Sequence, residues 1–308
     1  MAKISIPLYF FLFLLAFGLV NGSLAKEKIG TYEFKKGNVS VKLTNWGASI
    51  VSLIVPGKSG KLADIVLGIC GAAFTLNGTR YKLVANDGKN TIHGGPRGFS
   101  RVIWKVKRHE QESANPSIQF SYRSFDDEGG FPGDILVTVM YTLTGNKQLI
   151  VTMKAMALNK PTPVNLAQHA FWNVGGHNSS DVLYHYIQIF GPVSHQWIAS
   201  LYQQTIKSRI KKLPNGYDIN CVLNVNGYTK SGRVLELWTH APGMQFYTAN
   251  NLKGVKGKGG YVYNSHAGLC LETQGFPDAV NHPNFPSQIV TRGKPYTHSK
   301  LFKFTTSP

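Results

Sequence analysis

The 308-residue sequence predicts an all-β protein, and three observations lead to that prediction. Polar and apolar residues alternate over many short runs rich in Val, Ile, Thr and Tyr, which is the pattern of half-buried strands. No window shows a sustained apolar period of 3.6 residues, so long amphipathic helices are not expected. Thirty-two glycines and fifteen prolines divide the runs. Because neither an internal repeat nor a linker interrupts the chain, we expect one large sandwich.

The expected strands follow one another along the whole chain. The clearest pair, Asp134–Leu143 and Gln148–Leu158, consists of two alternating runs joined by a turn that contains Gly145 and Asn146. Such a Gly-Asn turn between alternating runs is typical of a β-hairpin. The other expected strands cover Asn38–Leu43, Ile118–Phe125, Tyr184–Phe190, Val234–Thr239, Met244–Thr248, Ala267–Thr273 and Leu301–Thr305.

The N-terminus has the pattern of a secretory signal peptide. One lysine is followed by an apolar run, Ile4–Val20, and then by small residues, which predicts a signal peptide over residues 1–22 with cleavage after Gly22 or Ala25. As a helix the run would be about 25 Å long, short of the roughly 30 Å hydrocarbon core, which favours a cleaved leader over a membrane anchor. We therefore expect a secreted protein with one domain over residues 28–308 and no anchor after cleavage.

Sequons and cysteines agree with this expectation. Three Asn-x-Ser/Thr glycosylation sequons occur, at Asn38, Asn77 and Asn178. Three cysteines occur, Cys70, Cys221 and Cys270. An odd number excludes a fully paired framework and leaves either one disulfide or none. A chain of this length buries about 75 % of its unfolded surface, so it needs no disulfide to be stable.

The formal charge of +18 favours contact with polyanions. The sequence lacks a basic helix, a ribonucleoprotein-type aromatic motif and zinc-finger spacing, so no nucleic-acid partner is expected. The lysines are scattered apart from one dense cluster, KSRIKK, at 207–212. We interpret the charge as a solvated basic surface with at most a weak attraction to acidic polysaccharide.

Glu272 is the first candidate catalytic residue, because glutamate is depleted in strands and costly to bury. In the run Ala267–Gln274, Leu269 and Leu271 would face one side of a sheet, and Cys270 and Glu272 the other. A carboxylate on a concave sheet face would be partly desolvated, which would raise its pKa and make it a useful base. A water-facing sheet surface is the alternative.

Two histidines are candidate partners for Glu272. His93 lies in NTIHGGPRGF and His169 in NLAQHAFWNVGGH. Neighbouring glycines allow a ligand to approach the backbone closely. Taken singly, each histidine also fits an ordinary loop or core position. His169 and His177 are too far apart in sequence for a tight metal-ligand pair, so no metal site is expected.

Taken together, long segments of the chain resemble the aldose 1-epimerase (galactose mutarotase) family in its plant form. The matching segments, in the family's order, are LNGTRYKL, NDGKNTIHGGPRGFSRVIW, SFDDEGGFPGD, NLAQHAFWNVGGHNS, KSGRVLELWTHAPGMQFYTANNL and HAGLCLETQGFPDAVNHPNFPS. They cover most of the chain from about residue 28 onwards. The resemblance implies a galactose-mutarotase-like β-supersandwich, a large twisted antiparallel sandwich.

The resemblance also implies the reaction and the residues that perform it. The α and β anomers of a free hexose, such as galactose or glucose, would be interconverted without a cofactor. Glu272 would take the proton of the anomeric hydroxyl, and His169 would protonate the ring oxygen. After ring opening, rotation about C1–C2 and closure would give the other anomer. His93, Asp218 and Gln245 would bind the sugar.

The residue types suit this chemistry without the resemblance. Mutarotation removes one proton and delivers another at opposite ends of a hemiacetal. A carboxylate with a raised pKa and a histidine titrating near neutral pH are suited to these two steps. The aromatic residues Phe171, Trp172 and Phe246 would pack either against the sugar ring or in the core.

The chain departs from the family in ways that favour a second hypothesis. Between Gly68 and Phe74 the family has an added segment with a Gly-Arg-x-x-Asn-Arg motif, whose arginine clamps sugar hydroxyls, and that segment is absent here. The family's Asp-His-Asn reads Asp-Ile-Asn at 218–220, and the stretch 191–209 does not resemble the family. The alternative function is therefore a weak or inactive sugar-binding or partner-binding protein on the same scaffold.

Two other enzyme classes are less well matched. A glycoside hydrolase needs two carboxylates that flank the scissile bond. The acidic run Asp126-Asp127-Glu128 precedes two glycines, so we expect it to form a loop instead. A sugar-phosphate epimerase would need an arginine cluster for the phosphate, and none is visible.

Overall fold

The fold is built almost entirely from strands. The computed structural model describes residues 27–68, 86, 91–189, 204–210, 213, 216–222, 225–228 and 231–307. All strand pairs within these residues are antiparallel. Over the same ranges the one α-helix is the short α1 (Ile206–Ile210). The all-β prediction is thus confirmed.

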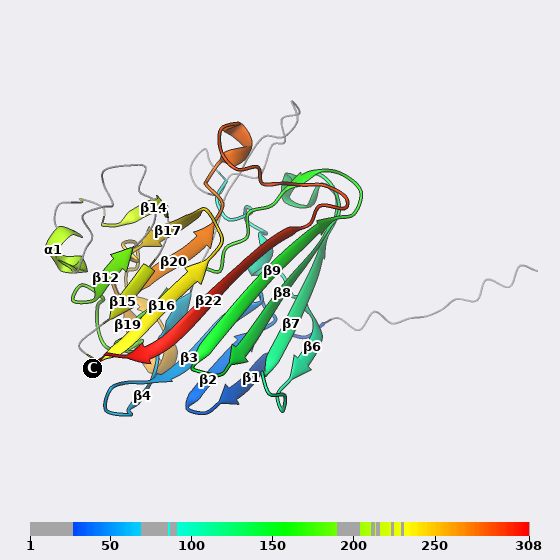
Figure 1. Ribbon diagram of the computed structural model, residues 1–308. Helices are drawn as coiled ribbons and strands as arrows, with labels where there is room; N and C mark the ends of the chain where they lie inside the picture. The colour runs from blue at the N-terminus through cyan, green and yellow to red at the C-terminus, as the bar shows by residue number, and fades with distance from the viewer. Residues whose placement is uncertain are drawn as a thin grey trace, which may run out of the picture.

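The largest sheet has nine strands and forms the broad surface that faces the viewer in Figure 1. In spatial order the strands are β13 (Gln204–Thr205), β12 (Tyr186–Ile189), β15 (Val225–Tyr228), β16 (Arg233–Thr239), β22 (Tyr296–Thr306), β9 (Gln148–Ala157), β8 (Ile135–Thr144), β7 (Ser117–Ser124) and β6 (Lys105–Glu110).

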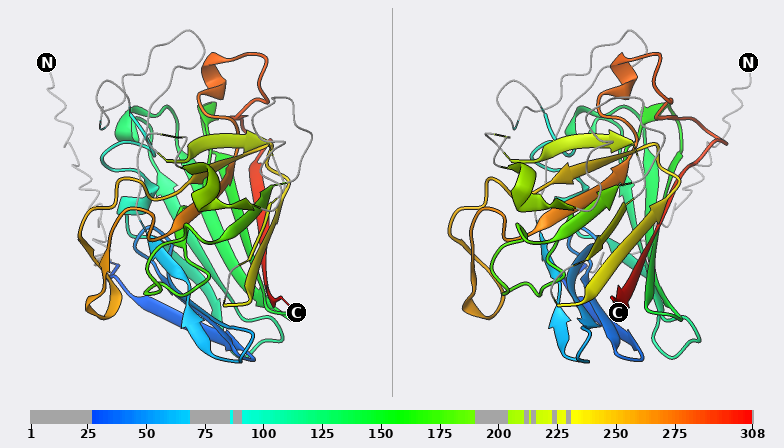
Figure 2. Two further views of the ribbon diagram at one scale, coloured as in Figure 1. Left: turned by 90° about the vertical axis from the view of Figure 1, so that its left-hand side faces the viewer. Right: turned by 60° about the vertical axis from the view of Figure 1, so that its left-hand side comes forward.

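Two further sheets pack behind it, as Figure 2 shows from two other sides. The five-stranded sheet consists of β14 (Asp218–Val222), β17 (Gly243–Tyr247), β20 (Leu269–Gln274), β11 (Ala170–Trp172) and β5 (Val66–Gly68). The four-stranded sheet consists of β1 (Thr31–Lys36), β2 (Val39–Thr44), β3 (Ser49–Pro56) and β4 (Leu62–Asp64). Two ribbons pair β10 (Thr162–Pro163) with β21 (Ile289–Val290), and β18 (Val255–Lys256) with β19 (Val262–Tyr263).

The main hydrophobic core lies between these sheets. Alternate residues of β8 are buried along its whole length, as strand periodicity requires. One cluster of buried side chains joins Leu53 of β3, Val137 of β8 and Leu271 of β20, and so includes all three larger sheets. One face of the five-stranded sheet is therefore fixed on the core, and its other face is left to form a site.

Several expected strands appear with different lengths. The β8–β9 hairpin forms as predicted, and Asn146 and Lys147 have positive φ in its turn. β22 is eleven residues long and begins at Tyr296, whereas the sequence predicted only Leu301–Thr305. The difference arises because the first half of β22 carries polar residues that are nonetheless buried, including His298.

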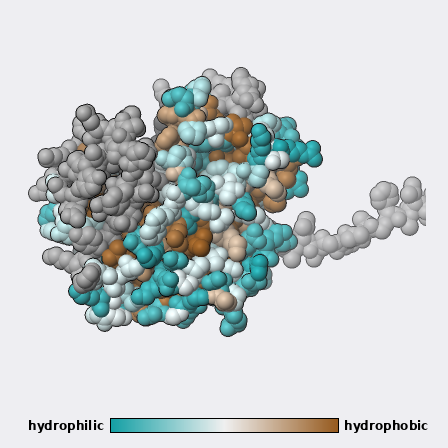
Figure 3. All heavy atoms as spheres, in the orientation of Figure 1, coloured by the Kyte–Doolittle hydropathy of each residue, from teal (hydrophilic) through white to brown (hydrophobic). Residues whose placement is uncertain are grey.

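The surface and the cysteines add three observations. On the face shown in Figure 3, apolar residues form separate patches among polar ones. No helix in the described ranges is long and apolar enough to span a membrane.

Cys270 is a buried free thiol. The predicted leader over 1–22, Cys70, Asn77 and the side chain of Cys221 lie outside the described residues.

Candidate active site

The candidate site lies on the face of the five-stranded sheet that points away from the main core. Gln245 of β17 pairs with Glu272 of β20 on one side and with Asn220 of β14 on the other. Residues directly opposite each other in an antiparallel sheet share a face. Asn220, Gln245 and Glu272 therefore form one row across three neighbouring strands.

A second row lies beside the first on the same face. Asp218 pairs with Tyr247, Tyr247 with Cys270, and Cys270 with Phe171 of β11. The expected alternation of β20 is confirmed, because Leu269 and Leu271 belong to the main core and Cys270 to a separate cluster.

The three aromatic candidates separate between the two faces. Trp172 and Phe246 are buried in the main core, so they have no access to a sugar, because their strand positions turn them away from the site. Phe171 is on the site face, and its ring lies 5.4 Å from that of His169. Phe171 is also almost fully buried, so it packs against the His169 ring and is not itself open to a ligand.

The segment that precedes β11 brings His169 to Glu272. Asn165, at the start of this segment, accepts a hydrogen bond from the Gly275 amide at 2.9 Å and donates one to the Gly275 carbonyl at 3.2 Å. Gly275 follows directly after β20, so this two-way contact holds the two segments side by side. As a result His169 Nε2 lies 3.4 Å from Glu272 Oε1.

His93 approaches the pair from a tight glycine-rich loop. The backbone of His93 has φ 58°, in the left-handed region, and the glycine pair predicted to allow close approach follows it directly. A Cβ on Gly98 would lie 2.1 Å from the His93 carbonyl oxygen, so the loop closes only with glycine there. The rings of His93 and His169 meet edge to face at 5.0 Å.

Burial controls the protonation of the pair. The Glu272 side chain is 7 % exposed, and burial raises its pKa to about 8; the Lys300 charge opposes this rise and the Asp218 charge adds to it. Burial lowers the pKa of His169 to about 4. The expectation of a raised pKa for the carboxylate is met, whereas the histidine pKa lies below the near-neutral value expected. Glu272 and His169 together therefore hold one proton around neutral pH.

The remaining predicted site residues gather around the pair. Gln245 Nε2 donates a hydrogen bond to Asp218 Oδ1 at 2.7 Å, beside Glu272 in the sheet. Donor atoms of His93, His169 and Glu272 all lie within 4.8 Å of one another. All five predicted site residues thus lie on or beside one sheet face. The three clustered donors are also close enough to surround a cation, which the sequence spacing did not predict.

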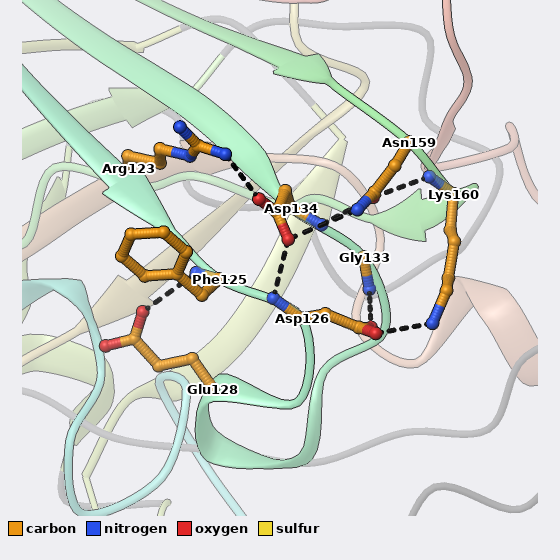
Figure 4. Close-up of polar contacts among 8 residues, drawn as sticks. All are labelled: Arg123, Phe125, Asp126, Glu128, Gly133, Asp134, Asn159 and Lys160. Carbon is orange, nitrogen blue, oxygen red and sulfur yellow. Dashed lines mark hydrogen bonds and ion pairs between the residues drawn. The ribbon is translucent and has the colours of Figure 1, made fainter. Parts of the chain in front are cut away.

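The acidic run Asp126-Asp127-Glu128 forms a loop, as expected, and Figure 4 shows how it is held. Asp126 accepts a hydrogen bond from the Gly133 amide at 2.6 Å and pairs with Lys160. Glu128 accepts one from the Phe125 amide at 3.3 Å. These carboxylates are occupied in fixing the loop, and a Cβ on Gly129 would contact Gly94 beside His93 at 3.6 Å. The loop therefore lies beside the His93 segment.

One residue near the site was missed by the sequence analysis. Lys300 is fully buried in β22, and its charge acts on both Glu272 and His169. A signal was present, because Lys300 occurs in phase with the buried residues His298, Phe302 and Phe304. Strand periodicity therefore placed this lysine inside the protein.

Comparison with known proteins identifies relatives over nearly the whole chain. The family model described as aldose 1-epimerase matches residues 30–303. Galactose mutarotase from Bos taurus is 34 % identical over 336 residues, which cover 92 % of this chain and 96 % of the relative. Aldose 1-epimerase from Escherichia coli is 27 % identical over 322 residues, covering 86 % and 91 %. Both alignments are longer than this 308-residue chain, so both relatives contain residues that have no counterpart in it.

Solved structures share the fold. An aldose epimerase homologue from C. elegans superimposes with a TM-score of 0.80 at 24 % identity, covering 91 % of this chain and all of the other. Galactose 1-epimerase from Lactobacillus acidophilus gives a TM-score of 0.73 at 17 % identity, covering 91 % and 99 %. The predicted galactose-mutarotase-like sandwich is therefore confirmed.

Proposed function

Because the chain belongs to the aldose 1-epimerase family, we propose that it is an isomerase that interconverts the α and β anomers of a free hexose, such as galactose or glucose. The observation that carries this proposal is the contact of 3.4 Å between His169 Nε2 and Glu272 Oε1, on the sheet face that also carries Gln245 and Asp218. Mutarotation requires one proton to be removed and another delivered, and this pair holds one proton around neutral pH.

In the proposed mechanism Glu272, as the carboxylate, takes the proton from the anomeric hydroxyl. His169, as the imidazolium, protonates the ring oxygen, and the C1–O5 bond breaks to give the open-chain aldehyde. Rotation about C1–C2 followed by the reverse transfers gives the other anomer. Before the sugar binds, the one proton of the pair lies mainly on Glu272, because burial raises the pKa of Glu272 and lowers that of His169. At 3.4 Å the proton needs only a short transfer to reach His169.

The neighbouring residues are assigned to sugar binding. Gln245 and Asp218 carry a donor and acceptors beside Glu272, which suits a pair of sugar hydroxyls. His93 is neutral, because partial burial and the charges of His169 and Arg101 lower its pKa, so its ring can accept or donate one hydrogen bond. None of these steps requires a cofactor.

A second function, binding of a sugar or partner without efficient catalysis, is favoured by one observation. The arginine-bearing segment expected between Gly68 and Phe74 is absent from the sequence, although its surroundings lie outside the described residues. Loss of this charged clamp would weaken binding of the sugar, which is why the binding alternative is kept.

The proton-transfer pair, however, is still in place. Between the two functions we therefore propose the active enzyme, with a high KM.

We also propose that the protein is secreted and glycosylated. The apolar leader over residues 1–22 supports secretion. Asn38, in the turn between β1 and β2, and Asn178, after β11, are both exposed. A surface-accessible asparagine is a requirement for this modification.

Polarimetry tests the catalytic proposal against the binding alternative. Freshly dissolved α-galactose or α-glucose is mixed with purified protein, and the approach to the equilibrium rotation is compared with the uncatalysed rate. We expect a rate that increases in proportion to protein concentration and does not change after dialysis against EDTA. A rate equal to background at every concentration, with sugar binding detected by calorimetry, would favour the binding alternative.

A further inference from the structure

Lys300 occupies an unusual position for a lysine. It lies in the middle of β22, between its partners Thr239 of β16 and Val151 of β9, and its side chain points between the sheets. The residue is 2 % exposed, and Nζ is buried without a hydrogen-bond partner among the described residues. An ammonium group in such surroundings is strongly disfavoured unless an opposite charge is close.

The acid that can act as counter-ion is Glu272. Among the described residues it is the only acidic side chain in the buried set. The other buried strong base, Arg233, donates hydrogen bonds to the carbonyl oxygens of Val55, Val174, Gly175 and Lys61 and is thereby satisfied. Lys300 has no such carbonyl partners among the described residues, so its main electrostatic compensation is the ionised form of Glu272, which exists when the proton of the pair lies on His169.

The packing around β22 fixes Lys300 beneath the site. His298, two residues earlier on the same face, contacts Thr273 Oγ1 through Nε2 at 2.9 Å and the Leu166 carbonyl through Nδ1 at 3.1 Å. Thr273 follows Glu272, and Leu166 belongs to the segment that carries His169. This face of β22 therefore lies under both members of the pair.

We propose that Lys300 is a positioning residue that acts through Glu272 and His169, and that its buried positive charge lowers the pH range in which the pair works. The proposal rests on the function proposed above. Lys300 makes no contact with the sugar, because it lies on the core side of the sheet. Its effect is carried by charge alone.

The sign of the effect follows from electrostatics. A positive charge favours the carboxylate form of Glu272 and disfavours the imidazolium form of His169, so it lowers both pKa values. Burial lowers the pKa of Lys300 itself to about 7, while the Glu272 charge raises it, so the ammonium is charged below neutral pH. The other titratable groups that interact with Glu272 or His169 are His93, Asp218, Tyr247 and Cys270. His298 interacts with Lys300, and His240 and Tyr296 lie against His298.

The test replaces Lys300 by methionine, which has a similar length and no charge. In Lys300→Met we expect the acid limb of kcat/KM to move up by about one pH unit, which is about a tenfold loss at a fixed pH on that limb, with KM little changed. The control is Lys303→Met on the same strand, whose partly exposed side chain pairs with Glu236 at 3.0 Å, and which should leave the limb in place. Lys300→Gln should behave like Lys300→Met.

Two further measurements separate this role from others. If Lys300 only held the fold together, Lys300→Met would lower Tm without moving the limb; we expect a Tm at or above that of the wild type, because an unpartnered ammonium is removed. Carbon-13 NMR of labelled histidine rings, with His169→Asn to assign the signal, follows His169 without any substrate in the pH range where Lys300 is charged, and should show a higher pKa in Lys300→Met. An unmoved acid limb or histidine titration in the folded variant overturns the proposal. An inactive wild type whose histidine titration still moves would contradict the proposed function and support the role of Lys300.

Discussion

His169 Nε2 lies 3.4 Å from Glu272 Oε1, although the two residues come from distant parts of the chain. The contact depends on the hydrogen bonds between Asn165 and Gly275, which hold the His169 segment against the end of β20. Burial then moves the two pKa values apart, upward for Glu272 and downward for His169. A pair of titratable groups with separated pKa values is the arrangement that acid–base catalysis requires.

The pH profile should reflect the pair as a unit. With two protons the pair lacks a base, and with none it lacks an acid, so we expect kcat/KM to rise as one proton leaves near pH 4 and to fall as the last leaves near pH 8. The measurement is polarimetry from pH 3 to 10 with the spontaneous rate subtracted. A single limb centred near the ordinary histidine value of about 6.5 would show that burial does not control the pair.

Asp218 should affect sugar binding more than the chemical step. Asp218→Asn removes a charged acceptor, and a hydrogen bond to a charged group is worth about 1.5–3 kcal/mol, so KM should rise by about 10- to 150-fold. Because the Asp218 charge also raises the pKa of Glu272, the alkaline limb should move to lower pH. Glu33→Gln on the distant strand β1 is the control. A fall in kcat with no change in KM would remove Asp218 from the binding role.

The missing arginine segment should explain a high KM. Grafting the family's arginine-bearing segment between Gly68 and Phe74 supplies one charge-assisted hydrogen bond, and we expect KM to fall by about 10- to 150-fold. The matched control is the same graft with its clamping arginine replaced by glutamine. If both grafts fold and both leave KM unchanged, affinity is limited elsewhere in the site.

Secretion and glycosylation are tested by expression in a eukaryotic secretory host. We expect protein in the medium that lacks residues 1–22 or 1–25 and loses mass on treatment with a glycosidase. Asn178, which lies close in sequence to the His169 segment, should be the least modified of the three sequons. A mature chain that still begins at Met1 and shows no change in mass would contradict this expectation.

Much of the fold could be predicted because strand periodicity and turn residues are local properties. The β8–β9 hairpin was visible as two alternating runs around Gly145 and Asn146. β22 was predicted too short because its first half contains His298 and Lys300, polar residues that the surrounding strands bury. Tertiary contacts decide the state of such residues, so a pattern of polar and apolar residues misses them.

The candidate site was predicted from residue types and from the resemblance, whereas its electrostatics depended on the packing. The alternation around Glu272 correctly placed its side chain on the face of the sheet that points away from the core, whereas Leu271 faces the core. The low pKa of His169 comes from burial between segments that are far apart in sequence. No local pattern carries that information. Lys300 shows the same limit, because its effect on Glu272 exists only once β22 lies beneath β20.

The central claim, that His169 and Glu272 form the acid–base pair, is tested most directly by the anomerisation rate of variants. Glu272→Gln removes the base and His169→Asn the proton donor, and each should lower turnover by at least about 10²-fold without loss of thermal stability. Asp127→Asn, in the exposed acidic loop, should leave turnover unchanged. The measurement is the rate for α-galactose above the spontaneous background, with Tm recorded for each protein. If folded Glu272→Gln turns over at the wild-type rate, the pair is not the catalytic centre, and a binding protein on an epimerase scaffold becomes the better account.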